Sequence, residues 1–112
     1  MELDSPKLRK SPRFFEMIPF ILMLNSHTIP KPHPEIIARV LENEAVLVLP
    51  LRGQVKVLND LGARIWTLVD GTHSIEEIIQ MICQEYDTPL ETATADTTEF
   101  LTQLAEKGIV IL

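Results

Sequence analysis

Val57-Leu58-Asn59-Asp60-Leu61-Gly62-Ala63-Arg64-Ile65-Trp66-Thr67-Leu68-Val69-Asp70-Gly71 is the stretch that decides the fold, because its hydrophobic spacing changes half-way. Residues 54–58 alternate in the manner of a strand with one buried face. After Asn59-Asp60 the apolar residues follow the spacing of a helix face: Leu61, Ile65, Leu68 and Val69. Asn59 or Asp60 can cap this helix, and Gly71 can take the left-handed conformation that ends it. We therefore expect a strand, a tight turn and a helix over residues 60–69, with no residue that looks like a reaction centre.

Two more strands are predicted before this stretch. Residues 36–41 and 45–49 are apolar runs joined by a turn at 42–44, and a second turn at 50–53 leads into strand 54–58. Three strands joined by short turns form an antiparallel meander. We expect its third strand to lie at or near the edge of the sheet, beside the last helix.

Two more helices are predicted after it. The second helix begins with a capping box between Ser74 and Glu77, and its apolar face is Ile75, Ile78, Ile79, Ile82, Cys83 and Tyr86. The third begins with another predicted capping box, Thr88-Pro89-Leu90-Glu91, and ends at Gly108. Its inner face is Ala93, Thr97, Phe100, Leu101 and Leu104. Residues 109–112 either pair as a short strand or fill the core.

The predicted fold class is α+β, a winged helix-turn-helix with a three-stranded antiparallel sheet followed by three helices. It occupies residues 35–112 of the 112-residue chain, and residues 1–34 form an N-terminal arm and a proline-rich linker. The arm contains an apolar run, Phe14–Leu24, that needs a partner in this chain or in a second copy. A signal peptide is disfavoured because Pro19 interrupts the run and no small-residue cleavage site follows. The run is also too short to span a bilayer. We expect a cytoplasmic protein that does not contact membranes.

The charge of the chain argues against nucleic acid as a partner. The net charge of −6 divides into +2 for residues 1–59 and −8 for residues 60–112. The second predicted helix has no Lys or Arg, and the third has Lys107 against four acidic residues. Because affinity for DNA depends on cations that contact phosphates, a winged-helix DNA-binding regulator is only an alternative hypothesis.

No residue pattern indicates catalysis, a metal or a cofactor. Cys83 is the single cysteine and lies on the apolar face of a helix, so we expect a buried thiol. His27, His33 and His73 are scattered, with no pair at metal-ligand spacing. The remaining candidates, Glu76, Glu77 and Glu85, are expected on the solvent side of the second helix. We therefore predict no catalytic residues, no metal ligands and no cofactor.

An exposed edge strand can bind a peptide by adding it to the sheet. Strand 54–58 together with the third helix would form such a groove. The alternative is an edge blunted by Lys56 or covered by the N-terminal arm, and the residue patterns alone do not choose between the two.

A series of short segments resembles the signature of the PqqD family. The series runs in order through 58–66, Val69-Asp70-Gly71, 74–79, Glu85-Tyr86-Asp87, Asp96, 100–104 and 108–110, and it spans residues 35–112. The resemblance implies a winged helix-turn-helix. It also implies a recognition element for ribosomally made and modified peptides, a class that includes precursors in the biosynthesis of pyrroloquinoline quinone (PQQ).

The resemblance also implies how such a protein works. A PqqD-like domain is a non-catalytic peptide chaperone that binds the leader of a precursor peptide as an added strand on the third strand. It presents the leader to a modifying enzyme, which is a radical SAM protein or a leader peptidase. The peptide-binding residues implied here are Gln54, Val55, Lys56, Val57, Leu58, Thr97, Leu101 and Leu104.

Two questions of assembly stay open from the sequence. The unpaired strand and the apolar arm fit a homodimer formed by strand or arm exchange, and they fit a monomer with the arm folded back equally well. A third hypothesis makes the chain a structural subunit whose Phe14–Leu24 arm docks on a partner enzyme.

Overall fold

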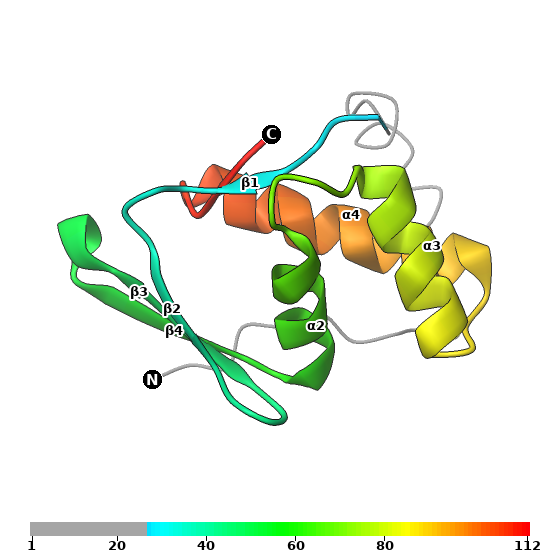
Figure 1. The fold of residues 1–112 in the computed structure, drawn as a ribbon, viewed down its shortest axis with the longest axis horizontal. Helices are drawn as coiled ribbons and strands as arrows, with labels where there is room; N and C mark the ends of the chain where they lie inside the picture. The colour runs from blue at the N-terminus through cyan, green and yellow to red at the C-terminus, as the bar shows by residue number, and fades with distance from the viewer. Residues whose placement is uncertain (1–26) are drawn as a thin grey trace.

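A computed structural model describes residues 27–112, which form a three-stranded antiparallel sheet followed by three helices (Figure 1). The sheet has the order β2-β3-β4. Its strands are β2 (Ile37–Val40), β3 (Ala45–Leu49) and β4 (Gln54–Leu58), and the helices are α2 (Asp60–Leu68), α3 (Ile75–Glu85) and α4 (Leu90–Glu106). The predicted α+β class and element order are confirmed. The apolar run Phe14–Leu24 lies outside the described residues.

The turns of the meander follow the sequence closely. β3 and β4 have the predicted bounds, while β2 is one residue shorter at each end than predicted. The first hairpin closes through a hydrogen bond of 2.7 Å from Leu41 N to Glu44 O. The second connection is a short 3₁₀ turn, η1 (Pro50–Arg52), after which Gly53 adopts φ +61°. A left-handed residue costs glycine little, so β4 can start at once after the turn.

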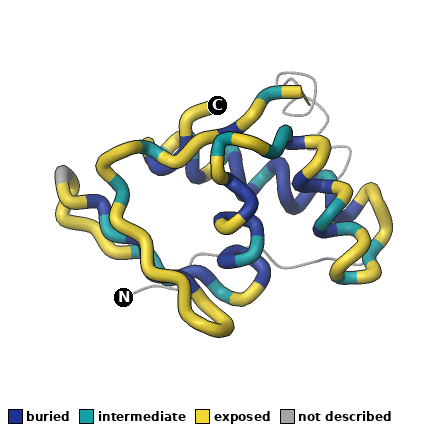
Figure 2. The backbone as a smooth tube through the Cα atoms, in the orientation of Figure 1, coloured by how far each residue is buried: buried dark blue, intermediate teal, exposed yellow. Residues whose placement is uncertain are grey.

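The sheet has one covered face and one open face. Residues paired across β3 and β4 share a face, as Ala45 does with Leu58 and Val48 with Val55. The inner face carries Ala45, Leu47, Leu49 and Leu58, all buried in the same core as the helices. The outer face carries Val46, Val48, Val55 and Val57, which are half-buried or exposed. Figure 2 shows the exposure of β2 along its whole length.

Local sequence explains where α2 and α3 begin. Asn59 Oδ1 accepts a hydrogen bond of 2.9 Å from Gly62 N and so caps α2. The capping box predicted for α3 is present: Ser74 N donates to Glu77 Oε1 (2.8 Å) and Glu77 N donates to Ser74 Oγ (3.1 Å). The left-handed Gly71 predicted after α2 is also observed, with φ +83°.

The capping box predicted for α4 is wrong. Pro89 occupies the N-cap position and no side chain caps the helix. The backbone of Thr88 forms hydrogen bonds with the end of α3 instead. Its N–H donates to Cys83 O (3.3 Å), and its carbonyl oxygen accepts from Cys83 Sγ (3.0 Å). The same arrangement leaves Cys83 half-buried, where full burial was expected.

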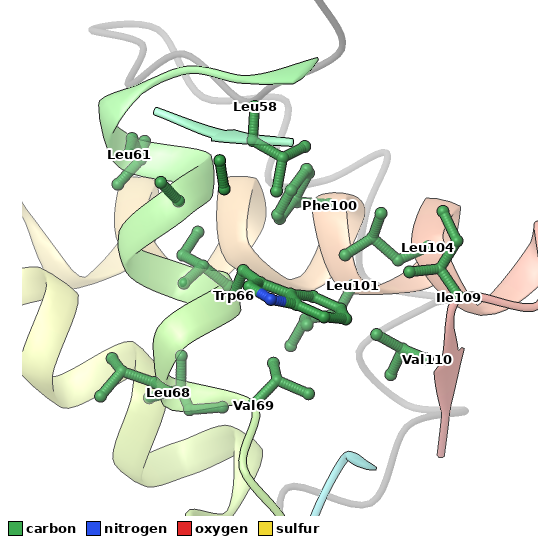
Figure 3. Packing of buried hydrophobic residues seen from close by; sticks show 14 of the residues in the cluster. Leu58, Leu61, Trp66, Leu68, Val69, Phe100, Leu101, Leu104, Ile109 and Val110 are labelled. Carbon is green, nitrogen blue, oxygen red and sulfur yellow. The ribbon is translucent and has the colours of Figure 1, made fainter. Parts of the chain in front are cut away.

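The core forms where α4 crosses the junction between β4 and α2. Figure 3 shows Trp66 of α2 beside α4, close to Leu101 and together with Phe100 and Leu104 in one cluster. The predicted inner face of α4 is buried as expected, with Leu101 fully inaccessible to solvent. Gly108 then turns the chain with φ +74°, and Ile109 and Val110 return into the core.

A second, two-stranded sheet joins the start and end of the described chain. β1 (Lys31–Pro32) pairs antiparallel with β5 (Val110–Ile111), and His33 N donates to Ile109 O (2.9 Å). Ile75 N donates to Thr28 O (2.9 Å), so the residues before β1 also touch the helical part. The closing residues therefore both pair as a strand and fill the core. The division of the chain at residue 34 stays a prediction.

The core packing gives a stability prediction. Leu101→Ala removes a fully buried side chain and leaves a cavity, so it should lower the free energy of unfolding by about 2–5 kcal/mol. Leu90→Ala is the matched control, since Leu90 is 54% exposed on the same helix, and its cost should stay within about 0.5 kcal/mol. Urea unfolding followed by circular dichroism measures both. Equal costs for the two variants would contradict the core described here.

Candidate functional site

Among residues 27–112, the three-stranded sheet has two unpaired edges, one on β2 and one on β4, and the edge of β4 is the candidate site. β4 pairs with β3 along its whole length and with no other strand among residues 27–112. In an antiparallel strand, alternate residues direct their N–H and C=O groups to opposite sides. Half of the β4 backbone groups therefore point away from β3 and can pair with another extended chain.

A hollow lies beside the first half of this edge. It has a volume of about 310 Å³ and is lined by Arg52, Gln54, Val55, Lys56 and Lys107, which we call the edge hollow. A second, more apolar hollow of about 180 Å³ adjoins it and shares Arg52 and Lys107 with it. Lys107 is the C-cap of α4, so the edge hollow lies between the start of β4 and the end of α4.

The predicted peptide-binding residues lie in two different environments. Gln54 and Val55 are exposed and Lys56 and Val57 half-buried at the edge. The other four are buried in the core: Leu58, Thr97, Leu101 and Leu104. A buried side chain contacts a ligand only if whatever covers it moves, so the peptide-binding role of these residues stays a prediction.

Sequence reasoning missed Arg52 and Lys107 as site residues. Each stands next to a glycine with positive φ, Gly53 and Gly108, at the end of a turn or helix. Their positions along the chain carry no signal that they meet, because only the packing of α4 against the sheet brings them together. The one clue is that Lys107 is the single cation of an acidic helix.

Four residues of the signature segments hold α2 against α3. Arg64 Nε and Nη2 donate to the two carboxylate oxygens of Glu85, both at 2.7 Å. This hydrogen bonding lowers the pKa of Glu85 and raises the pKa of Arg64. Tyr86 Oη donates to Asp60 Oδ2 (3.2 Å), and burial, followed by the charge of Asp60, raises the pKa of Tyr86 to about 12. These side chains serve the scaffold and do not line the edge hollow.

The turn between α2 and α3 is built around Asp70. Its Oδ1 accepts hydrogen bonds from Thr72 Oγ1 (2.6 Å) and Thr72 N (2.9 Å), and His73 Nδ1 lies 3.1 Å away. The hydroxyl of Thr72, followed by its backbone N–H, lowers the pKa of Asp70 to about 2. This polar cluster orients the loop that leads into the α3 capping box.

The described part of the chain also bears on metal binding and membrane crossing. Within residues 27–112 no group of three or more His, Cys, Asp or Glu side chains could hold a metal ion. No helix in this range is long and apolar enough to cross a membrane.

Comparison with known proteins identifies the family. Residues 44–110 match the sequence profile of the family described as Coenzyme PQQ synthesis protein D (PqqD). The chain belongs to the PqqD family. The matched segment contains β3, β4 and all three helices, so it includes the β4 edge and all five residues that line the edge hollow. No curated protein matches this PqqD-family chain.

Two solved structures resemble this PqqD-family protein. One is TbiB1 in complex with the TbiA(beta) leader peptide, at 31% identity and a TM-score of 0.68, covering 71% of this chain and 93% of that one. The other is the PqqD truncation of Methylobacterium extorquens PqqCD, a stand-alone recognition element for ribosomally synthesized and post-translationally modified peptides. It is 27% identical with a TM-score of 0.64, covering 79% of this chain and 94% of that one.

The Asp70 turn gives a pH prediction. Because the folded pKa of Asp70 lies below its ordinary value of 3.8, its contribution to stability is present above about pH 4 and is lost as the pH falls toward 2. Thr72→Val removes the hydroxyl donor but keeps the backbone donor, so the pKa should rise part of the way toward 3.8. Thr72→Ser keeps both donors and is the control. The side-chain carboxyl carbon of Asp70, followed by NMR, reports the midpoint, and an unchanged midpoint in Thr72→Val would refute the assigned cause.

Proposed function

We propose that this chain binds the leader of a ribosomally made precursor peptide as an added strand on β4 and presents it to a modifying enzyme. The observation that carries the proposal is the edge of β4, which pairs with no further strand among residues 27–112, beside a hollow in a PqqD-family chain. TbiB1, which is 31% identical to this chain, binds a leader peptide. The chain itself has no catalytic role in this proposal.

Strand addition fits the physical properties of this edge. Main-chain hydrogen bonds to the outward groups of β4 supply affinity for any extended peptide, and alternate side chains supply specificity. The proposed contacts are Gln54, Val55, Lys56 and Val57 along the edge. Leu58, Thr97, Leu101 and Leu104 are also proposed contacts, and because they are buried they reach the leader only if the residues that cover them move.

The modifying enzyme is proposed by class. It is a radical SAM enzyme or a leader peptidase, and PQQ biosynthesis is one pathway among several that use such a pair. Because the ligand is a ribosomal product awaiting modification, we place the binding in the cytoplasm. A homodimer formed by strand exchange would occupy the same edge of β4, so dimerisation and peptide binding would compete.

The proposal predicts that every second residue of the leader forms backbone hydrogen bonds with β4. Leader peptides encoded beside the gene of this chain are titrated into the isotope-labelled full chain and followed by NMR. Shifts should cluster on 54–58 and on the end of α4. Each N-methylation of the leader backbone at one of these alternate residues should weaken binding about tenfold, because it removes one hydrogen bond to β4. Methylation of the intervening residues, which point to solvent, is the control. Losses without alternation, or shifts that avoid β4, would contradict strand addition.

The alternative function, a winged-helix DNA-binding regulator, makes the opposite prediction. α3 carries no Lys or Arg, and α4 contains four acidic residues and no cation within its bounds. We expect fluorescence anisotropy of labelled duplex DNA to stay flat on titration with the full chain at about 50 mM salt, where non-specific binding is strong. A rise in anisotropy that disappears as salt increases would favour the regulator.

A further inference from the structure

The cations of the described chain are concentrated at one end of the β4 edge. Residues 27–112 contain six Lys or Arg against thirteen Asp or Glu. Three of the six, Arg52, Lys56 and Lys107, line the edge hollow, and no Asp or Glu lines it. The adjoining apolar hollow contributes one acid, Glu35, together with His33. A strongly acidic protein therefore keeps a locally positive site beside the backbone edge that we assign to the leader.

Three different elements deliver these charges. Arg52 ends η1, Lys56 lies in the middle of β4 and Lys107 caps α4. Arg52 is exposed and forms no ion pair with any residue that the structure describes, and its Nη2 comes within 3.6 Å of the position that a Cβ on Gly108 would occupy. The guanidinium therefore reaches from the sheet to the end of α4, which encloses the hollow on that side.

The end of α4 favours two of the three cations. A helix C-terminus carries a partial negative charge, which favours cations nearby and accounts for Arg52 and Lys107. Lys56 is not at a helix end. It pairs with Leu47 across the sheet, so its side chain points to the inner face, toward the hollow. An anionic group in the hollow would interact favourably with all three.

We propose that the leader carries an aspartate or glutamate whose carboxylate enters the edge hollow among Arg52, Lys56 and Lys107. This inference rests on the proposed function and specifies its ligand. On a strand paired with β4, the carboxylate belongs at the inner-facing position beside Lys56, since residues directly opposite share a face. Two residues further along, beside Leu58, the inner-facing side chain is apolar.

The experiment uses a display library of random linear peptides, selected on the immobilised full chain. Binders whose NMR shifts map to 54–58 should share one acidic position. Replacing that acid by its amide, Asp by Asn or Glu by Gln, should weaken binding about tenfold, as expected for a charge-assisted contact. Because the chain has a net charge of −6, non-specific attraction would enrich basic peptides instead.

Charge reversal at the edge hollow tests which residues bind the acidic side chain of the peptide. Lys56→Glu and Arg52→Glu should abolish the preference for the acid over its amide, and a Lys at the same peptide position should restore binding. Lys56→Gln removes the charge with less risk to the fold and should reduce the preference. Arg39→Glu makes the same charge change on β2, away from the hollow, and should leave the preference intact. Circular dichroism confirms that each variant is folded.

The outcomes separate this inference from the function on which it rests. Binders that map to β4 without a shared acid, or an acid preference unchanged in Lys56→Glu and Arg52→Glu, overturn the inference and leave strand addition standing. A charge reversal that lowers stability but does not change peptide binding would mean that these cations only stabilise the end of α4, and it would also overturn the inference. If no binder maps to β4, both the inference and the proposed function fail.

Discussion

The packing of α4 against α3, α2 and the inner face of the sheet in one core is the interaction on which both the fold and the site depend. Leu101 and its neighbours bury against Trp66, and this contact sets the direction of α4 relative to the sheet. The direction of α4 in turn decides where the helix ends. Lys107 therefore arrives beside the start of β4 as a consequence of core packing, and the edge hollow exists because the core is formed.

Four residues of the family signature have a structural task that is separate from the edge hollow. Arg64, Glu85, Tyr86 and Asp60 join α2 to α3 through hydrogen bonds, and none of the four lines the edge hollow. These hydrogen bonds hold α2 against α3. A binding surface whose affinity comes from main-chain hydrogen bonds needs a rigid frame more than it needs particular side chains.

The structural features that could be predicted from the sequence are those determined by neighbouring residues. The bounds of β3 and β4 follow from apolar runs between turn residues, and the Ser74–Glu77 capping box needs only residues within one turn. The prediction at Thr88 failed because the end of α3 competes for the same backbone groups. Arg52 and Lys107 could not be joined from the sequence, since an edge hollow between a turn and a helix end depends on tertiary packing. The peptide-binding role of the core residue Thr97 was predicted from the family resemblance alone, and the fold neither requires nor excludes it.

Strand addition by itself leaves two ambiguities that the charges of this edge can resolve. Main-chain pairing accepts a peptide in either direction and in any register, because every residue offers the same backbone groups. The edge of β4 is asymmetric, with cations around Gln54 and an apolar inner face at Leu58. A peptide whose acidic and apolar residues match this order binds in one direction and one register, while a reversed or shifted peptide places its carboxylate against the apolar end. Under the proposed function, a fixed register would hold the rest of the precursor at a defined position relative to the modifying enzyme.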